Sequence, residues 1–129
     1  MRLLLDTCAV LWYCTGSERI AARLQKTLTD PRNELLSSDV SLLEIAIKCQ
    51  LGKLDIGGRP SEVIPSLLEE HLIDGLAISS ATIFALEGLP LLHRDPFDRL
   101  LVAQAKVSSL TLVTPDPLIR QYDVKTLWH

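Results

Sequence analysis

The sequence has few aromatic residues, few cysteines and no excess of positive charge. Aromatics make up 5% of the 129 residues, so the core has to be built mainly from Leu, Ile, Val and Ala. The odd number of cysteines, without a C-x-x-C spacing, argues against a disulfide framework and against a zinc site. We expect Cys8, Cys14 and Cys49 to be small buried hydrophobic residues. A net charge of −3 provides no overall attraction for nucleic acid, so local arginines or bound cations would have to supply it.

Long hydrophobic runs are also missing. No run of about 18 apolar residues, as a transmembrane helix needs, occurs in the sequence. The opening MRLLLD reaches an aspartate too early to contain the apolar region of a signal peptide. We therefore expect a soluble, cytoplasmic protein with no membrane partner.

The overall composition is that of a globular domain. Hydrophobic residues account for 47% of the chain and charged residues for 22%. The length suffices for one sizeable core but hardly for two, and no repeat or linker divides the chain. We expect residues 1–129 to form one domain.

Apolar strands and amphipathic helices alternate along the chain, which is typical of an α/β fold with a parallel sheet covered by helices on both faces. The predicted strands are 3–5, 35–36, 75–78, 110–113 and 124–127. The predicted helices are 7–12 with Thr7 as cap, 17–29, 40–51 closed by Gly52, 61–72 with Pro65 near its first turn and Leu72 turned inward, 79–87, 95–105 and 118–122.

Acidic residues recur where ligands bind in such folds, beyond the carboxyl ends of the strands. Asp6 and Asp116 each follow a predicted strand, although a lone aspartate there also fits a turn or a helix cap. Asp95 is a good cap for a helix that begins with Pro96, and Asp98 would then favour the helix dipole. Taken singly, these aspartates need no function.

Glu44 also has a structural explanation. The spacing Ser41-x-x-Glu44 matches a capping box, in which both side chains satisfy the start of a helix. However, the sequence already looks helical from Val40 onward, which weakens that interpretation. Lys48 lies one turn further along, so we expect a solvent-exposed salt bridge with Glu44.

The case for chemistry rests on convergence, because carboxylates from distant parts of the chain would project from one edge of the sheet. Such groups repel each other unless a cation compensates their charge. Oxygen ligands without histidine or cysteine at metal spacing indicate Mg²⁺ or Mn²⁺. The predicted reaction is metal-assisted attack of water on a phosphodiester.

Four segments, LLDTCAVLW, SDVSLLEIAIK, HRDPFDRLLVAQA and TLVTPD, occur in an order and spacing that resemble PIN-domain ribonucleases. The resemblance is closest to toxins of the VapC type, in the branch with an H-x-D-P-F-D-R signature. It implies a sheet of five strands in the order 3-2-1-4-5, a homodimer and a cognate antitoxin that blocks the cleft. It also implies Mg²⁺, with Mn²⁺ able to substitute, as the cofactor.

The resemblance carries over to individual residues. We place Asp98 above Asp95 because DRLLVAQA matches the part of the motif common to the wider family, which leaves Asp95 as an additional acid. The implied catalytic and metal-binding residues are Asp6, Glu44, Asp98 and Asp116, and the implied supporting residues are Asp95, Thr114, Thr7 and Ser41.

Basic residues next to the acids are candidates for contacts with substrate phosphate. His93 could act as a base or bind phosphate, although a role in loop packing or in orienting Asp98 is favoured. Arg94 and Arg99 could hold phosphate, and Arg99 could equally pair with Asp95 or Glu44.

The resulting hypothesis is a Mg²⁺/Mn²⁺-dependent endoribonuclease toxin that leaves 5′-phosphate and 3′-hydroxyl ends on RNA. One alternative is a PIN nuclease of routine RNA processing without an antitoxin. Alternatives from another class are a receiver-like phosphorylation switch and an inactive protein-binding module. A receiver requires a lysine after a late strand, where this chain has Asp116.

Overall fold

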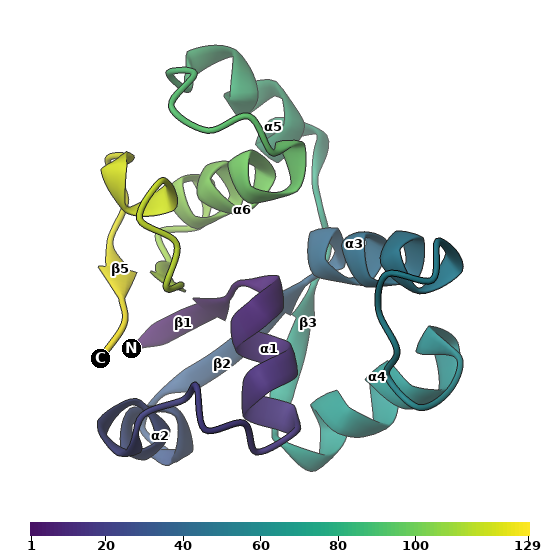
Figure 1. Ribbon diagram of the computed structural model, residues 1–129. Helices are drawn as coiled ribbons and strands as arrows, with labels where there is room; N and C mark the ends of the chain where they lie inside the picture. The colour runs from purple at the N-terminus through teal and green to yellow at the C-terminus, as the bar shows by residue number, and fades with distance from the viewer.

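The computed structural model describes residues 1–129 and is built around a five-stranded sheet (Figure 1). The strands lie in the order β3-β2-β1-β4-β5, and every neighbouring pair is parallel. This confirms the predicted fold class and strand order. The strands are β1 (Arg2–Leu5), β2 (Glu34–Ser38), β3 (Ile73–Leu76), β4 (Thr111–Val113) and β5 (Thr126–Leu127).

Helices cover both faces of this sheet, as predicted. They are α1 (Thr7–Cys14), α2 (Ala22–Thr29), α3 (Asp39–Gln50), α4 (Pro60–Glu70), α5 (Ser80–Phe84) and α6 (Pro96–Val107), with short 3₁₀ turns η1 (Ala85–Gly88) and η2 (Ile119–Gln121). None of these helices has the length and hydrophobicity needed to span a bilayer.

The core has two halves because successive side chains of a strand point to opposite faces of the sheet. Leu3 and Leu5 of β1 pack with residues of α1 and α2, whereas Leu4 packs with residues of α6. All three leucines of β1 are 0% exposed. The central strand therefore anchors both halves of the core and fixes the position of the segment that follows it.

Two helix starts differ from the prediction. Asp6, not Thr7, caps α1, because its Oδ1 accepts the Ala9 backbone N–H at 2.8 Å. The next helix begins at Ala22 rather than at residue 17. The Ser17 hydroxyl instead accepts the Arg19 backbone N–H, a local turn that competes with helix formation.

Helix α4 contains two further differences. It begins at Pro60, which moves Pro65 from the first turn into the second. Leu72 follows the helix and is 84% exposed with φ of +57°, so the prediction that it turns inward is wrong. The backbone reverses at this residue to enter β3, and the reversal turns the side chain away from the core. The end of α3, by contrast, is as predicted, with Gly52 at φ of +73°.

The cysteines follow the prediction only in part. Cys14 is buried, Cys49 is half-buried and Cys8 is exposed, and none forms a disulfide. Cys8 is exposed because it lies on the side of α1 that leads to the exposed Thr15, away from the buried side chains of Val10 and Tyr13.

Candidate active site

Asp6 lies directly after β1 and is 5% exposed. Burial raises the pKa of its carboxyl to about 6, although hydrogen bonds from the Thr114 hydroxyl and the Ala9 backbone N–H oppose this shift. The charges of Asp116 and Glu44 raise the pKa further. Asp6 thus caps a helix and at the same time belongs to a group of interacting carboxylates.

Glu44 lies on α3 and is 6% exposed. Helix α3 begins at Asp39 and is capped by Ser38, so Glu44 lies too far along the helix to take part in a capping box. The Thr7 hydroxyl donates to Oε1 at 2.8 Å, and Lys48 Nζ lies 2.6 Å from Oε2. The predicted ion pair with Lys48 is confirmed, although on the glutamate side it is buried rather than exposed.

Thr7 connects Glu44 to a second hydroxyl. Its Oγ1 also lies 2.9 Å from Oγ of Ser41, which is 0% exposed. These two hydroxyls join the start of α1 to α3, and Thr7 contacts Glu44 directly. Their supporting role stays a prediction.

Asp95 and Asp98 differ in what their carboxylates do. Asp95 caps α6, with Oδ1 accepting the backbone N–H groups of Phe97 at 2.8 Å and Asp98 at 3.3 Å. The Asp98 carboxylate caps nothing, and its Oδ2 lies 3.0 Å from Nε2 of His93. Burial, followed by the charge of Asp95, raises the pKa of Asp98 to about 7.

Asp116 lies in the loop after β4. Its backbone N–H donates to the Thr114 hydroxyl at 3.1 Å, and its Oδ1 accepts the Leu118 N–H at 2.8 Å. Thr114 is 0% exposed and contributes hydrogen bonds to both Asp6 and Asp116. It thereby ties together the segments that follow β1 and β4.

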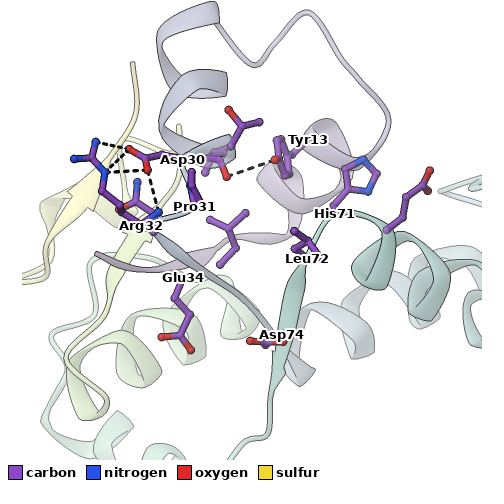
Figure 2. Close-up of a pocket in the computed structure, with 13 residues that line it drawn as sticks. Tyr13, Asp30, Pro31, Arg32, Glu34, His71, Leu72 and Asp74 are labelled. Atoms are coloured by element: carbon purple, nitrogen blue, oxygen red, sulfur yellow. Dashed lines mark hydrogen bonds and ion pairs between the residues drawn. The ribbon is translucent and has the colours of Figure 1, made fainter.

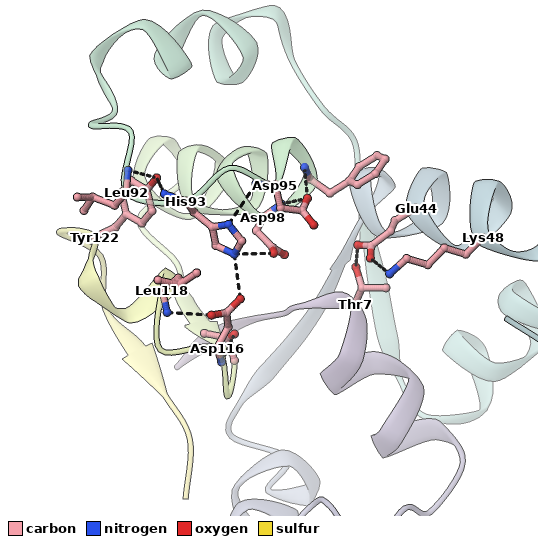
Figure 3. A network of polar contacts seen from close by, with 12 residues as sticks. Thr7, Glu44, Lys48, Leu92, His93, Asp95, Asp98, Asp116, Leu118 and Tyr122 are labelled. Atoms are coloured by element: carbon pink, nitrogen blue, oxygen red, sulfur yellow. Dashed lines mark hydrogen bonds and ion pairs between the residues drawn. The ribbon is translucent and has the colours of Figure 1, made fainter. Parts of the chain in front are cut away.

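His93 lies between Asp98 and Asp116 (Figure 3), with Nε2 at 3.0 Å from Oδ2 of each. Ligand atoms of the three residues all lie within 4.8 Å of one another, a spacing compatible with a bound metal ion. The favoured interpretation of His93, a contact with Asp98, agrees with this geometry. The structure brings Asp98 and Asp116 together through a residue from the loop that precedes α6.

The two arginines of the HRDPFDR motif lie apart from this group. Arg94 is exposed and remains available to a ligand in solution. Arg99 donates to the Leu89 carbonyl at 3.3 Å, and its Nε is buried without a partner. Of the two alternatives for Arg99, the pairing with Asp95 or Glu44 is not observed, because its guanidinium bonds the Leu89 carbonyl while the Asp95 carboxylate caps α6.

The charges at this edge of the sheet are unevenly compensated. Glu44 has Lys48 as a cationic partner, whereas burial and neighbouring carboxylates raise the pKa values of Asp6 and Asp98. A hard divalent cation with oxygen ligands suits such a group, because its charge would offset the repulsion. The donor set therefore fits a divalent metal ion.

A separate hollow of about 570 Å³ lies at the amino ends of β2 and β3 (Figure 2). Tyr13, Leu35, His71 and Leu72 are among the residues that line it, and none of the predicted site residues does. The carboxylates lie beyond the opposite ends of the strands. This hollow is therefore not part of the candidate active site.

A model of the PIN-domain family matches residues 3–125, and the chain belongs to this family. PIN domains are nucleases and use divalent metal ions. This membership favours a nuclease over the receiver-like alternative. No curated protein matches the sequence.

Solved structures share the fold at low sequence identity. A structure of VapBC2 from Rickettsia felis, bound to a DNA fragment from the VapBC2 promoter, has 16% identity and a TM-score of 0.73, with 98% of each chain covered. VapBC-1 from nontypeable Haemophilus influenzae has 18% identity and a TM-score of 0.64, covering 98% of this chain and 97% of that one. A toxin-antitoxin complex from Klebsiella pneumoniae has 17% identity and a TM-score of 0.57, covering 88% and 86%. This chain has the same fold over nearly its full length.

Sequence reasoning missed one part of the site. The Tyr122 hydroxyl oxygen accepts the backbone N–H groups of Leu92 and His93 at 3.2 and 3.0 Å. No local pattern marks this tyrosine, because its partners lie 30 and 29 residues away in the sequence. Only the packing of the C-terminal segment against α6 reveals the contact.

Proposed function

We propose that this chain is a metal-dependent endoribonuclease and the toxin component of a type II toxin-antitoxin system. One observation carries the proposal: Asp6, Asp98 and Asp116, from distant segments, share one edge of the sheet, and two of them have pKa values raised to about 6 and about 7. A raised carboxyl pKa reflects a free-energy cost of ionisation, which a divalent cation relieves. A PIN nuclease with such a group of carboxylates is equipped for metal-assisted hydrolysis.

The proposed metal-binding residues differ in how available their carboxylates are to a cation. They are Asp6, Glu44, Asp98 and Asp116. Glu44 already has a cationic partner in Lys48, whereas neither Asp98 nor Asp116 is paired with a lysine or an arginine. We therefore assign Asp98 and Asp116, supported by Asp6, the main part in binding Mg²⁺ or Mn²⁺. Glu44 adds negative charge and becomes a ligand only if Lys48 moves away.

The chemistry follows from this arrangement. A divalent cation held by Asp98 and Asp116, with support from Asp6, would activate water for attack and would offset the charge on the phosphate. The Thr114 hydroxyl bonds Asp6 and Asp116, and the Thr7 hydroxyl, which also contacts Ser41, bonds Glu44. These contacts hold the three carboxylates in place. The exposed Arg94 is free to contact a neighbouring phosphate. In-line attack by water forms a new P–O bond and breaks the bond from phosphorus to the ribose 3′-oxygen. Water gives up a proton and the departing 3′-oxygen takes one up, which leaves 5′-phosphate and 3′-hydroxyl ends.

The partners proposed are a second copy of this chain and an antitoxin. Two of the solved structures with this fold are VapBC proteins, and another is a toxin-antitoxin complex. An acidic site attracts a basic segment of an antitoxin electrostatically. Helix α3 and the residue that follows it expose a group of large apolar side chains, which suits a dimer interface. They are Leu42, Leu43, Ile47 and Leu51.

Cleavage assays on purified protein and an RNA pool test the proposal. We expect EDTA to abolish cleavage and the products to carry 5′-phosphates, as shown by ligation-dependent end sequencing. Asp98→Asn should lose roughly 100-fold or more in rate, because it removes a charged ligand, and Asp95→Asn about tenfold or less. Asn also caps helices well, so Asp95→Asn is a matched control that keeps the start of α6.

Four results would each contradict a part of the proposal. Cyclic-phosphate ends or undiminished activity in EDTA would exclude metal-assisted hydrolysis. A larger loss in Asp95→Asn than in Asp98→Asn would overturn the assignment of the two aspartates. For the toxin role, expression of the wild-type chain alone should arrest growth, and harmless high-level expression would favour an RNA-processing nuclease.

A further inference from the structure

The loop that carries His93 is fixed to the segment that follows Asp116 (Figure 3). Tyr122 is 4% exposed, and its hydroxyl oxygen accepts the backbone N–H groups of Leu92 and His93. The 3₁₀ turn η2 joins Tyr122 to the Asp116 loop, where the Arg120 N–H donates to the Asp116 carbonyl at 3.2 Å. The His93 ring in turn contacts the Asp116 side chain, so Tyr122, His93 and the Asp116 loop are connected in a ring of hydrogen bonds.

The hydrogen bonds of the His93 ring define which nitrogen carries hydrogen. A backbone N–H can only donate, and that of Asp95 lies 3.1 Å from Nδ1, so Nδ1 is an acceptor without hydrogen. The ring hydrogen is therefore on Nε2. This N–H lies between Oδ2 of Asp98 and Oδ2 of Asp116, 3.0 Å from each.

This tautomer leaves His93 unsuited to two familiar roles. A general base or a metal ligand needs a free lone pair that faces the reacting atom or the cation. The only ring lone pair, at Nδ1, already accepts the Asp95 N–H. Nε2 can act only as a donor to the two carboxylates.

We propose that His93 is a positioning residue for Asp98 and Asp116, and that Tyr122 positions His93 in turn. The proposal rests on the proposed function, since it takes these two carboxylates as the main metal ligands. The shared donor holds two like-charged groups together and fixes one oxygen of each before a cation binds. Such preorganisation increases metal affinity without adding a ligand.

Two substitutions of His93 separate the possible roles. His93→Gln keeps an N–H donor at a similar reach but cannot serve as a base, whereas His93→Ala removes the donor. We expect calorimetric titration with Mn²⁺ to give a dissociation constant within about threefold of wild type for His93→Gln and about tenfold or more weaker for His93→Ala. Tyr122→Phe should fall between them. His71→Gln, remote from the site, is the matched control and should match wild type.

Three further measurements complete the test. Circular dichroism shows whether each variant is folded, and cleavage at saturating Mn²⁺ measures the reaction apart from metal affinity. Two-bond ¹H–¹⁵N spectra of the metal-free wild type should show the hydrogen of His93 on Nε2. Rescue by glutamine together with this tautomer supports the donor role.

Other outcomes overturn the proposal. If His93→Gln weakens Mn²⁺ binding as much as His93→Ala and the spectra place the hydrogen on Nδ1, His93 is a metal ligand. If His93→Gln binds Mn²⁺ normally but loses cleavage as fully as His93→Ala, His93 is a base. A wild-type chain that binds no Mn²⁺ contradicts the proposed function itself, and this proposal with it.

Discussion

At the scale of single residues, the carboxylates combine local structural roles with the metal binding proposed for them, and the sequence separates the two only in part. The cap formed by Asp95 and the place of Asp98 in the first turn of α6 could be predicted, because capping depends on neighbours within a few positions. The contact between His93 and Asp116 could not, because it joins residues 23 positions apart. Residue types near a helix start thus predict local bonds, while the assembled site depends on the fold.

The raised pKa values of Asp6 and Asp98 make the stability of the metal-free protein depend on pH. A folded pKa above the unfolded value of 3.8 means that the folded state holds the proton more tightly than the unfolded state. Stability from these groups is fully present below about pH 4 and is lost as pH rises through about 6 to 7. Between these limits, acidification favours the folded state.

We therefore expect the melting temperature in EDTA to rise as pH falls from about 7.5 to 5. Asp6→Asn removes one buried charge, so it should raise the melting temperature at pH 7.5 and flatten the profile, while abolishing cleavage. Asp123→Asn, at an exposed position, is the matched control and should leave the profile unchanged. A wild-type profile that is flat or that falls on acidification would contradict the burial of these charges.

At the scale of helices and strands, the prediction succeeded where periodicity and breakers agree. Helix α3 was placed within one residue at each end, because apolar periodicity ends at Gly52, which adopts a positive φ. The start of α2 was misplaced, because the Ser17 turn competes with the helix and leaves no sequence signal that separates the two. Leu72 looked like a core residue by spacing, yet the chain reversal before β3 exposes it.

The contact between α1 and α3 includes a buried hydrogen bond from Thr7 to Glu44. A substitution of Thr7 can remove this bond while keeping the shape of the side chain. Thr7→Val preserves the volume of the side chain but leaves Glu44 Oε1 without its donor. We expect a loss of about 1–3 kcal/mol in the free energy of unfolding, measured by urea denaturation. Thr15→Val is the matched control, because the Thr15 hydroxyl bonds only the carbonyl one turn earlier, at an exposed helix end. Equal losses in the two variants would show that the Glu44 contact adds nothing to stability.

At the scale of the whole molecule, the parallel sheet explains how distant carboxylates meet. All five strands run in one direction, so the segments after β1 and β4 emerge at the same edge. This convergence could be predicted from the alternation of strands and helices and from the family resemblance. Which side chains pair with one another depends on packing that no sequence pattern encodes. Examples are the pairing of Lys48 with Glu44 and the contacts of His93 with Asp98 and Asp116.

The exposed face of α3 leads to a prediction about assembly. Leu43, Ile47 and Leu51 recur every fourth residue and are 50%, 38% and 62% exposed, so they form a continuous apolar row. An apolar row of this kind on a folded chain is typical of a surface that a partner covers. If a second copy covers it, the wild-type chain should sediment as a dimer at micromolar concentration. Ile47→Lys should sediment as a monomer, and at high dilution its melting temperature should equal that of the wild-type chain. Leu72→Lys introduces the same charge at a residue that is 84% exposed at the other edge of the sheet, and it should remain dimeric. A wild-type monomer, or a dimer that survives Ile47→Lys, would exclude this face as the dimer interface.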